Sequence, residues 1–395
     1  MRTLAIVVGI SLFIAIPQDR AAFPSQQVPS QQVDDLFVIF QGGRDGYMDR
    51  RGKIVIHPHF ESWERDFAEG RAVYGLSPKP SDVDHTKFGY IGEKGQVVVP
   101  AQFDAAQDFS EGLAAVALNV GKSPKHAFER PRHWGYIDKN GKIVITPQFR
   151  KARPFSGGLA AVQNLQYKWG YTDTSGKIIV PFQFEDAASF SEGKAAVLIG
   201  ERVGFIDRTG TLVIPAQFRE ARSFSEGMAR VAITGVFPDA RMAPHQFDSG
   251  SGKFGYINES GHNVFEVEAV NVEDFSEGLA AFQIENQKES PYASRPSVVT
   301  GRTGYIWCGY LDKAGHVLIP PRYQSCGPFA EGLANVFLDG SWQYLDSTGK
   351  IVLGAPFDWV APFRHGLAPV RDHKNGNGYI DKSGKLIVPT STTAP

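Results

Sequence analysis

Short runs of apolar residues alternate with glycine-centred turns along most of this chain. In the copy that starts at Trp134, side chains alternate in character as far as Asp138, which is the pattern of a β-strand. Asn140 and Gly141 then supply a tight hairpin turn, and residues 142–145 return as a β-branched strand. A third strand is expected at residues 159–162. Each unit is therefore predicted to be a three-stranded antiparallel meander.

The unit recurs about nine times, and a Gly-Tyr or Gly-Phe pair marks its first strand. The glycines of this pair are Gly46, Gly89, Gly135, Gly170, Gly204, Gly255, Gly309 and Gly378, and Gln343 takes the place once. The shortest steps are 34 and 35 residues, and longer steps contain inserts near 76–87, 118–133, 233–253 and 283–307. Because the inserts fall in one connection of the unit, we expect them on one side of a repeat array.

Both faces of the predicted hairpin carry apolar residues, which a sheet with one wet face would not show. Each small sheet is therefore expected to pack against a neighbour on both sides, roughly 10 Å apart. A ring of blades, as in a propeller, and an open superhelical stack both satisfy this condition. The small pair Ala160-Ala161 suits a crowded inner strand and favours the ring-like, propeller-type version of this all-β fold.

The repeated residues resemble the WG repeat, also called the KWG repeat, of bacterial proteins. The resemblance rests on W/F-G-Y-x-D, G-K-x-V-I-P, a following Phe and F-S-E-G-L-A-A-V, between about residues 45 and 389. It implies a β-rich bacterial repeat protein that mediates interactions, and it implies little about activity.

Residues 4–16 form an apolar run of 13 residues that Arg2 precedes and Pro17 ends. This length fits the core of a signal peptide and is short of the roughly 20 residues of a membrane-spanning helix. We expect a signal peptide over 1–22, a flexible leader over 23–35, one repeat domain over 36–390 and a tail over 391–395. The protein is therefore expected to be exported, periplasmic or extracellular, with no stable membrane span after cleavage.

Charge and cysteine content narrow the classes of function. Lys plus Arg total 41 and Asp plus Glu total 42, so the chain lacks the basic excess of a nucleic-acid binder. Cys308 occupies the position of Trp134, and Cys326, 18 residues on, occupies that of Ala152. In an exported protein such a pair is predicted to form a disulfide, with two free buried thiols as the alternative. We expect neither a metal site nor a cofactor.

Several residues that could carry chemistry have simpler interpretations. The Asp column, represented by Asp138, starts each tight turn, where its side chain can bond the turn's backbone. The Glu column, represented by Glu111, is expected to form a solvated rim, with a cation-binding or ligand-binding rim as the alternative. Gly250-Ser251-Gly252-Lys253-Phe254-Gly255 fits GxGxxG but leads into a strand rather than a helix. His57 and His59 share a strand face, yet no third metal ligand can be named.

Function is expected where the copies differ. Two inserts combine basic and aromatic residues suited to an anionic glycan or an acidic partner: Lys122, Lys125, Phe128, Arg130 and Arg132 in one, and Tyr292, Arg302 and Trp307 in the other. The leading hypothesis is a non-catalytic exported scaffold that binds a protein or cell-envelope glycan. A carbohydrate binder with Trp63, Trp307 and Trp359 as platforms is the first alternative, and an enzyme with its site at a ring centre is the second.

Overall fold

The computed structural model describes residues 35–61, 66–77, 85–119, 132–235, 252–286, 305–372 and 376–390. They belong to one compact unit, Asp35–Pro395, and form antiparallel β-sheets. The described residues contain no helix long and apolar enough to cross a membrane. The predicted all-β class is therefore confirmed.

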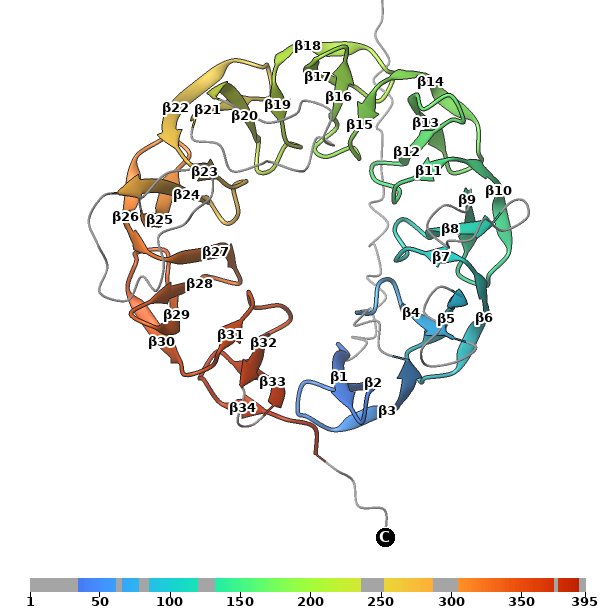
Figure 1. Cartoon of the computed structure of the whole chain (residues 1–395), viewed down its shortest axis with the longest axis horizontal. Coiled ribbons are helices and arrows are strands. Elements are labelled where there is room, and N and C mark those ends of the chain that lie inside the picture. Colours follow the sequence, from blue (N-terminus) through green and yellow to red (C-terminus); the bar gives the residue numbers. More distant parts are fainter. Residues whose placement is uncertain are drawn as a thin grey trace, which may run out of the picture. The chain divides into compact units, whose positions relative to one another are not determined.

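The sheets are nine blades arranged in a ring (Figure 1). Blades 3 to 9 are four-stranded sheets, and blades 1 and 2 are two halves of a six-stranded sheet. A single residue pair, Glu61 with Gly75, joins these halves. The first strand of each four-stranded blade lies toward the centre of the ring, and the last strand lies toward its circumference (Figure 1).

The strands are, in chain order, β1 (Phe37–Gln41), β2 (Arg44–Met48) and β3 (Ile54–Glu61) in blade 1; β4 (Arg71–Leu76), β5 (Lys87–Gly92) and β6 (Val97–Phe103) in blade 2; β7 (Ala105–Ala106), β8 (Leu113–Asn119), β9 (Arg132–Asp138) and β10 (Ile143–Phe149) in blade 3; β11 (Lys151–Ala152), β12 (Leu159–Gln163), β13 (Trp169–Asp173) and β14 (Ile178–Phe184) in blade 4; β15 (Asp186–Ala187), β16 (Ala195–Ile199), β17 (Arg202–Ile206) and β18 (Leu212–Phe218) in blade 5; β19 (Glu220–Ala221), β20 (Met228–Gly235), β21 (Gly252–Asn258) and β22 (Asn263–Ala269) in blade 6; β23 (Asn271–Val272), β24 (Leu279–Asn286), β25 (Tyr305–Asp312) and β26 (Val317–Tyr323) in blade 7; β27 (Ser325–Ala330), β28 (Leu333–Leu338), β29 (Ser341–Leu345) and β30 (Ile351–Ala355) in blade 8; and β31 (Trp359–Val360), β32 (Leu367–Asp372), β33 (Gly376–Asp381) and β34 (Leu386–Ile387) in blade 9.

Each repeat of the sequence is divided between two blades. In the repeat that starts at Trp134, β10 ends blade 3 at Phe149, and β11 starts blade 4 at Lys151. The predicted meander contained the strands at 134–138, 142–145 and 159–162, but not the two-residue strand β11. A strand of this length has no alternating pattern that a sequence could show.

Both faces of a blade are buried, as predicted. In β9, Tyr136 packs toward blade 4 with Phe155 and Val162, and Ile137 packs toward blade 2 with Tyr90. Tyr136 and Ile137 are fully buried. Since adjacent residues of one strand contact opposite neighbours, the blades share a continuous apolar layer around the ring.

The glycine of the Gly-Tyr pair is required by a close backbone approach. A Cβ on Gly135 would lie 2.3 Å from the Ile145 carbonyl oxygen, because β10 bulges over β9 next to Pro147. Where Gln343 replaces this glycine, Gly354 stands opposite it, and the two residues pair without that bulge. The exception therefore preserves the sheet by removing the crowding.

Blades 1 and 9 close the ring. The Tyr379 hydroxyl donates to the Val38 carbonyl at 2.8 Å, and its ring meets Phe37 edge to face with centroids 5.2 Å apart. The Thr390 amide donates to the Gly52 carbonyl at 2.8 Å. The ring-like propeller is thus the observed arrangement, and the open stack is excluded.

Candidate functional site

The order of strands assigns every connection to one of two faces of the ring. In a four-stranded blade such as blade 3, the turn between β7 and β8 and the turn between β9 and β10 lie at the same end, since successive strands run in opposite directions. We call this end of the blades the turn face. The connection between β8 and β9 and the link to the next blade lie at the opposite end, which we call the insert face.

The four long inserts all leave the ring from the insert face. In blades 3, 6 and 7 the insert connects the two middle strands: β8 to β9, β20 to β21, and β24 to β25. In blade 2, which has three strands, it connects the corresponding strands β4 and β5. The expectation that the inserts share one side is therefore confirmed by the positions of the strands that flank them.

Most of the predicted binding residues lie outside the described residues. These are Lys122, Lys125, Phe128, Arg130, Tyr292 and Arg302, and their role stays a prediction. Arg132 is the first residue of β9, and Trp307 lies in β25 opposite Ile284. Both therefore lie on strands that flank an insert.

Of the three tryptophans considered as glycan platforms, the structure describes Trp307 and Trp359. Trp63 is outside the described residues. Trp307 is half-buried in blade 7, whereas Trp359 is 45% exposed in blade 9, beneath the Arg371 guanidinium. Because blade 8 separates these two blades, Trp307 and Trp359 do not form a continuous aromatic strip.

The insert face also carries exposed apolar side chains that sequence reasoning did not single out. They stand at the middle connections of blades 1, 2, 4 and 5, and they are Phe40, Leu76, Leu165, Tyr167 and Ile199. Tyr167 is 61% exposed, and the Arg150 guanidinium lies 4.0 Å from its ring centroid. These short connections have no common motif, so only their place in the fold groups them.

The Glu column on the turn face is mostly exposed to solvent, as expected, and it also joins neighbouring blades. The Glu69 carboxylate of blade 2 accepts from the backbone amides of Glu111 and Gly112 in blade 3, at 2.7 and 3.0 Å. Glu111 in turn accepts from Gly157 and Gly158 of blade 4, at 2.7 and 2.8 Å. The carboxylates that bond the next blade in this way are Glu69, Glu111, Glu192, Glu226, Glu277 and Glu331.

These glutamates have backbone φ angles between 50° and 55°, in the left-handed region that costs non-glycine residues about 1 kcal/mol. One or two charge-assisted hydrogen bonds from the next blade offset that cost. A cation completes the arrangement at three places: Lys139 lies 3.1 Å from Glu69, Lys313 3.1 Å from Glu226, and Lys382 3.2 Å from Glu331. Each lysine belongs to the second turn of the next blade.

The cation and the amides change the acidity of these carboxyls. Burial alone would raise the pKa of Glu69, but hydrogen bonds from Lys139 and from the amide of Gly112 outweigh it, so the pKa lies below its usual value. The same balance, with Lys313 and Lys382 as cations, lowers the pKa of Glu226 and Glu331. The glutamates are therefore anionic at neutral pH.

The Asp column caps turns, as predicted. Asp138 accepts from the amides of Asn140 and Lys142, at 2.9 and 3.0 Å. The GxGxxG segment runs into a strand, β21, as the sequence indicated.

His57 and His59 are exposed, and within the described ranges no group of three or more His, Cys, Asp or Glu could hold a metal ion.

A cluster of charged residues joins the inner strands of blades 6 and 7. Arg230 stands where four other copies have Ala, is 1% exposed, and donates to Asn271 Oδ1 at 3.0 Å. Arg222 lies 3.5 Å from Glu273 and from Asp274. Burial lowers the pKa of Arg230 to about 10 and raises the pKa of Asp274. Arg230 nevertheless remains charged at neutral pH, and the cluster connects the two blades.

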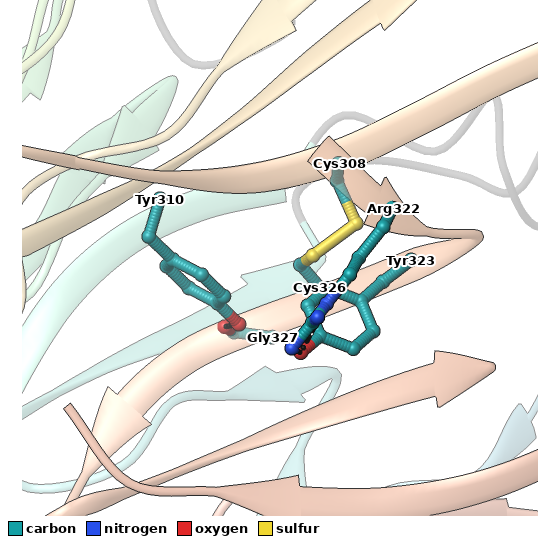
Figure 2. The surroundings of a disulfide bond; sticks show 6 residues. All are labelled: Cys308, Tyr310, Arg322, Tyr323, Cys326 and Gly327. Atoms are coloured by element: carbon teal, nitrogen blue, oxygen red, sulfur yellow. Dashed lines mark hydrogen bonds between the residues drawn. A yellow bond between two sulfur atoms is a disulfide. The ribbon is translucent and has the colours of Figure 1, made fainter. Parts of the chain in front are cut away.

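Cys308 and Cys326 form a disulfide, as predicted (Figure 2). Cys308 lies in β25 of blade 7 and Cys326 in β27 of blade 8, so the bond crosses between blades. Beside it, the Tyr310 hydroxyl donates to the Gly327 carbonyl at 2.8 Å (Figure 2). The covalent link thus replaces the apolar contact that other copies make at this position.

Comparisons with known proteins identify the repeat. The family model of the WG containing repeat matches residues 46–74, 88–122, 134–166, 169–202, 204–236, 254–287, 309–342 and 344–376. No curated protein sequence matches the chain. Among solved structures, the computationally designed protein Ika8 is similar at 10% identity, covering 82% of this chain and 93% of its own, with a TM-score of 0.41.

BamB from Moraxella catarrhalis is similar at 8% identity, covering 88% of this chain and 96% of its own, with a TM-score of 0.40. The family matches span more than half of the chain, and each contains a strand pair of the ring described above. The chain therefore belongs to the family of WG containing repeat proteins.

Proposed function

We propose that this propeller is a non-catalytic scaffold that binds a partner protein through its insert face. One observation carries the proposal: the four inserts leave the ring from the same face. On the opposite face, the turns are bonded to one another by the Glu column. Variable segments on a rigid framework are the usual location of binding residues.

The chemistry of the insert face supports a protein partner. Exposed apolar side chains such as Leu76 and Tyr167 lie on the face from which strands lead into the inserts that contain Lys122, Arg130 and Tyr292. Protein interfaces are enriched in aromatic residues and arginine around apolar contacts. A glycan would instead stack on aromatic rings, and Trp307 and Trp359 stand on blades that are not neighbours.

We further propose that the protein acts outside the cytoplasm, in the periplasm or the extracellular space. The apolar run at residues 4–16 has the length of a signal-peptide core. The disulfide between Cys308 and Cys326 is of the kind that persists in oxidising compartments. A fusion of residues 1–22 to a reporter that is active only after export tests this part independently of partner binding.

Site-specific photo-crosslinking in the native cell tests the binding face. A photoreactive residue replaces Leu76 or Tyr167 on the insert face, and matched replacements at Lys142 and Lys350 probe the turn face. We expect crosslinks to one protein from the insert-face positions, lost when Lys122, Lys125 and Arg130 are changed together to Glu. Crosslinks confined to the turn-face positions would contradict the proposal, and crosslinks to glycan would favour the carbohydrate alternative.

A further inference from the structure

Two of blades 2 to 9 lack the glutamate that joins a blade to its neighbour: blade 9 has His365 at this position, and blade 4 has Gly157. In blade 9, His365 Nδ1 lies 3.2 Å from a carboxylate oxygen of Asp35. In blade 4 the turn reads Ser156-Gly157-Gly158, so Gly157 stands where blades 2, 3 and 5 to 8 carry Glu. The following turn, in blade 5, keeps the backbone that receives the carboxylate elsewhere, with Glu192 at φ 50° and Gly193 at φ 77°. Among the described residues, neither the Glu192 nor the Gly193 amide donates a hydrogen bond.

Blade 5 nevertheless has a cation, Arg208, at the position of the lysines that contact the Glu column elsewhere. Arg208 is the second residue of its turn in blade 5, the position that Lys139 has in blade 3. Its guanidinium Nη2 would lie 2.9 Å from a Cβ on Gly158, so it reaches the turn of blade 4. Arg208 is exposed, and no ion pair or hydrogen bond of its side chain occurs within the described part of the chain.

Between blades 2 and 3, the same three groups surround a carboxylate. The amides of Glu111 and Gly112 each bond one oxygen of Glu69, and Lys139 lies 3.1 Å from that carboxylate. Blades 4 and 5 supply equivalent amides and an arginine but no carboxylate. Arginine presents a planar fork of donors that suits a carboxylate better than lysine does.

We infer that the amides of Glu192 and Gly193 and the guanidinium of Arg208 form a binding site for a carboxylate of another molecule. The ligand is an acidic side chain or the terminal carboxylate of a protein. Two amide bonds and one arginine hold a single carboxylate weakly, so a biological ligand makes further contacts on the turn face. The site is separate from the insert face, and either proposal can fail without the other.

Titration by amide-detected NMR tests the site in the full chain. The probes are N-acetylglutamic acid α-amide for a side-chain carboxylate, N-acetylglycine for a terminal one, and N-acetylglutamine amide as the neutral control. We expect saturable shifts of the Glu192 and Gly193 amides with the carboxylates and none with the neutral probe. The ratio of the two carboxylate affinities distinguishes the two sources of ligand.

Variants distinguish carboxylate binding at this site from non-specific attraction to positive charge on the surface. Arg208→Gln is expected to weaken binding roughly tenfold, which corresponds to the loss of one charge-assisted interaction. Arg202→Gln, an exposed arginine at the opposite end of the same blade, is expected to leave it unchanged. Gly157→Glu supplies the missing carboxylate from within the chain and is expected to abolish binding, whereas Gly157→Ala keeps the site open.

Three results would overturn the inference. The first is the absence of a saturable shift at Gly193 with either carboxylate. The second is equal weakening by Arg208→Gln and Arg202→Gln, or undiminished binding in Gly157→Glu. The third is tighter binding of inorganic phosphate than of both carboxylates, which would make this a phosphate site.

Discussion

The hydroxyl of the Gly-Tyr tyrosine should be a measurable part of the bond between blades. The Tyr171 hydroxyl donates to the Ala188 carbonyl of blade 5 at 2.7 Å, and Tyr171 is fully buried. Phe205 occupies the equivalent position in blade 5. It faces Phe224 with centroids 5.0 Å apart and planes at 62°, close to the 4.9 Å and 59° of Tyr171 with Phe190. A paired test follows: Tyr171→Phe removes the hydroxyl and Phe205→Tyr adds one.

The magnitudes follow from burial. Tyr171→Phe loses a hydrogen bond worth about 1 kcal/mol and leaves a buried carbonyl unsatisfied, for about another 1 kcal/mol. Phe205→Tyr is expected to gain up to about 1 kcal/mol, because its hydroxyl can reach the carbonyl of Arg222. Burial raises the pKa of Tyr171 far above its usual value, so the hydroxyl remains a donor at neutral pH.

Urea unfolding at neutral pH, followed by tryptophan fluorescence, gives both changes in the free energy of unfolding. Tyr167→Phe is the matched control, since Tyr167 is 61% exposed and its change should stay within about 0.5 kcal/mol. If Tyr171→Phe costs no more than Tyr167→Phe, or if Phe205→Tyr destabilises the ring, the argument that these hydroxyls hold the blades together is refuted.

Three further perturbations test other parts of the ring. Replacing Cys308 and Cys326 together by Ala should lower the free energy of unfolding by about 3 kcal/mol, and reduction of the wild type should give a similar loss in urea titrations. Changing Glu69, Glu226 and Glu331 together to Gln should flatten the acid limb of the stability curve. Their folded pKa values lie below the ordinary 4.5, so their contribution is present above that pH and is lost as the pH falls through the folded values. Gly135→Ala, whose Cβ would lie 2.3 Å from a carbonyl oxygen, should cost roughly 2 kcal/mol in thermal melts. Gly354→Ala, with nothing within 4 Å, should change stability by less than about 0.5 kcal/mol.

Sequence reasoning succeeded where a feature lies within one repeat. The Asp138 turn cap lies within residues 138–142, and the alternation of residues 134–138 shows which side chains share a face. The disulfide was also predictable, because Cys308 and Cys326 occupy the positions of Trp169 and Ala187, which belong to one apolar cluster in their own copy. The turn cap and the strand are predicted by local residue patterns, and the disulfide is predicted by aligning the copies.

Features that depend on contacts between distant residues were not predictable. Ring closure depends on the hydrogen bond between Tyr379 and Val38, which are 341 residues apart. Strand β1 carries no repeat motif, so the sequence does not show that it belongs to blade 1. The sequence predicts the solvated rim of the Glu column but not its bonds between blades, whose donors are backbone amides of the next copy, 42 residues from Glu69 to Glu111. Any residue has a backbone amide, so the sequence carries no sign of this bond.

A departure from the repeat is informative only when its neighbours are known. Gln343 stands opposite Gly354, Cys308 is bonded to Cys326, and Arg230 is bonded to Asn271, so each of these departures is compensated in the fold. Gly157 is different, because the amides that the missing carboxylate would bond and the arginine beside them remain in place without it. Within the described chain, no carboxylate replaces the missing one between blades 4 and 5. We therefore assign these amides and Arg208 a carboxylate from another molecule.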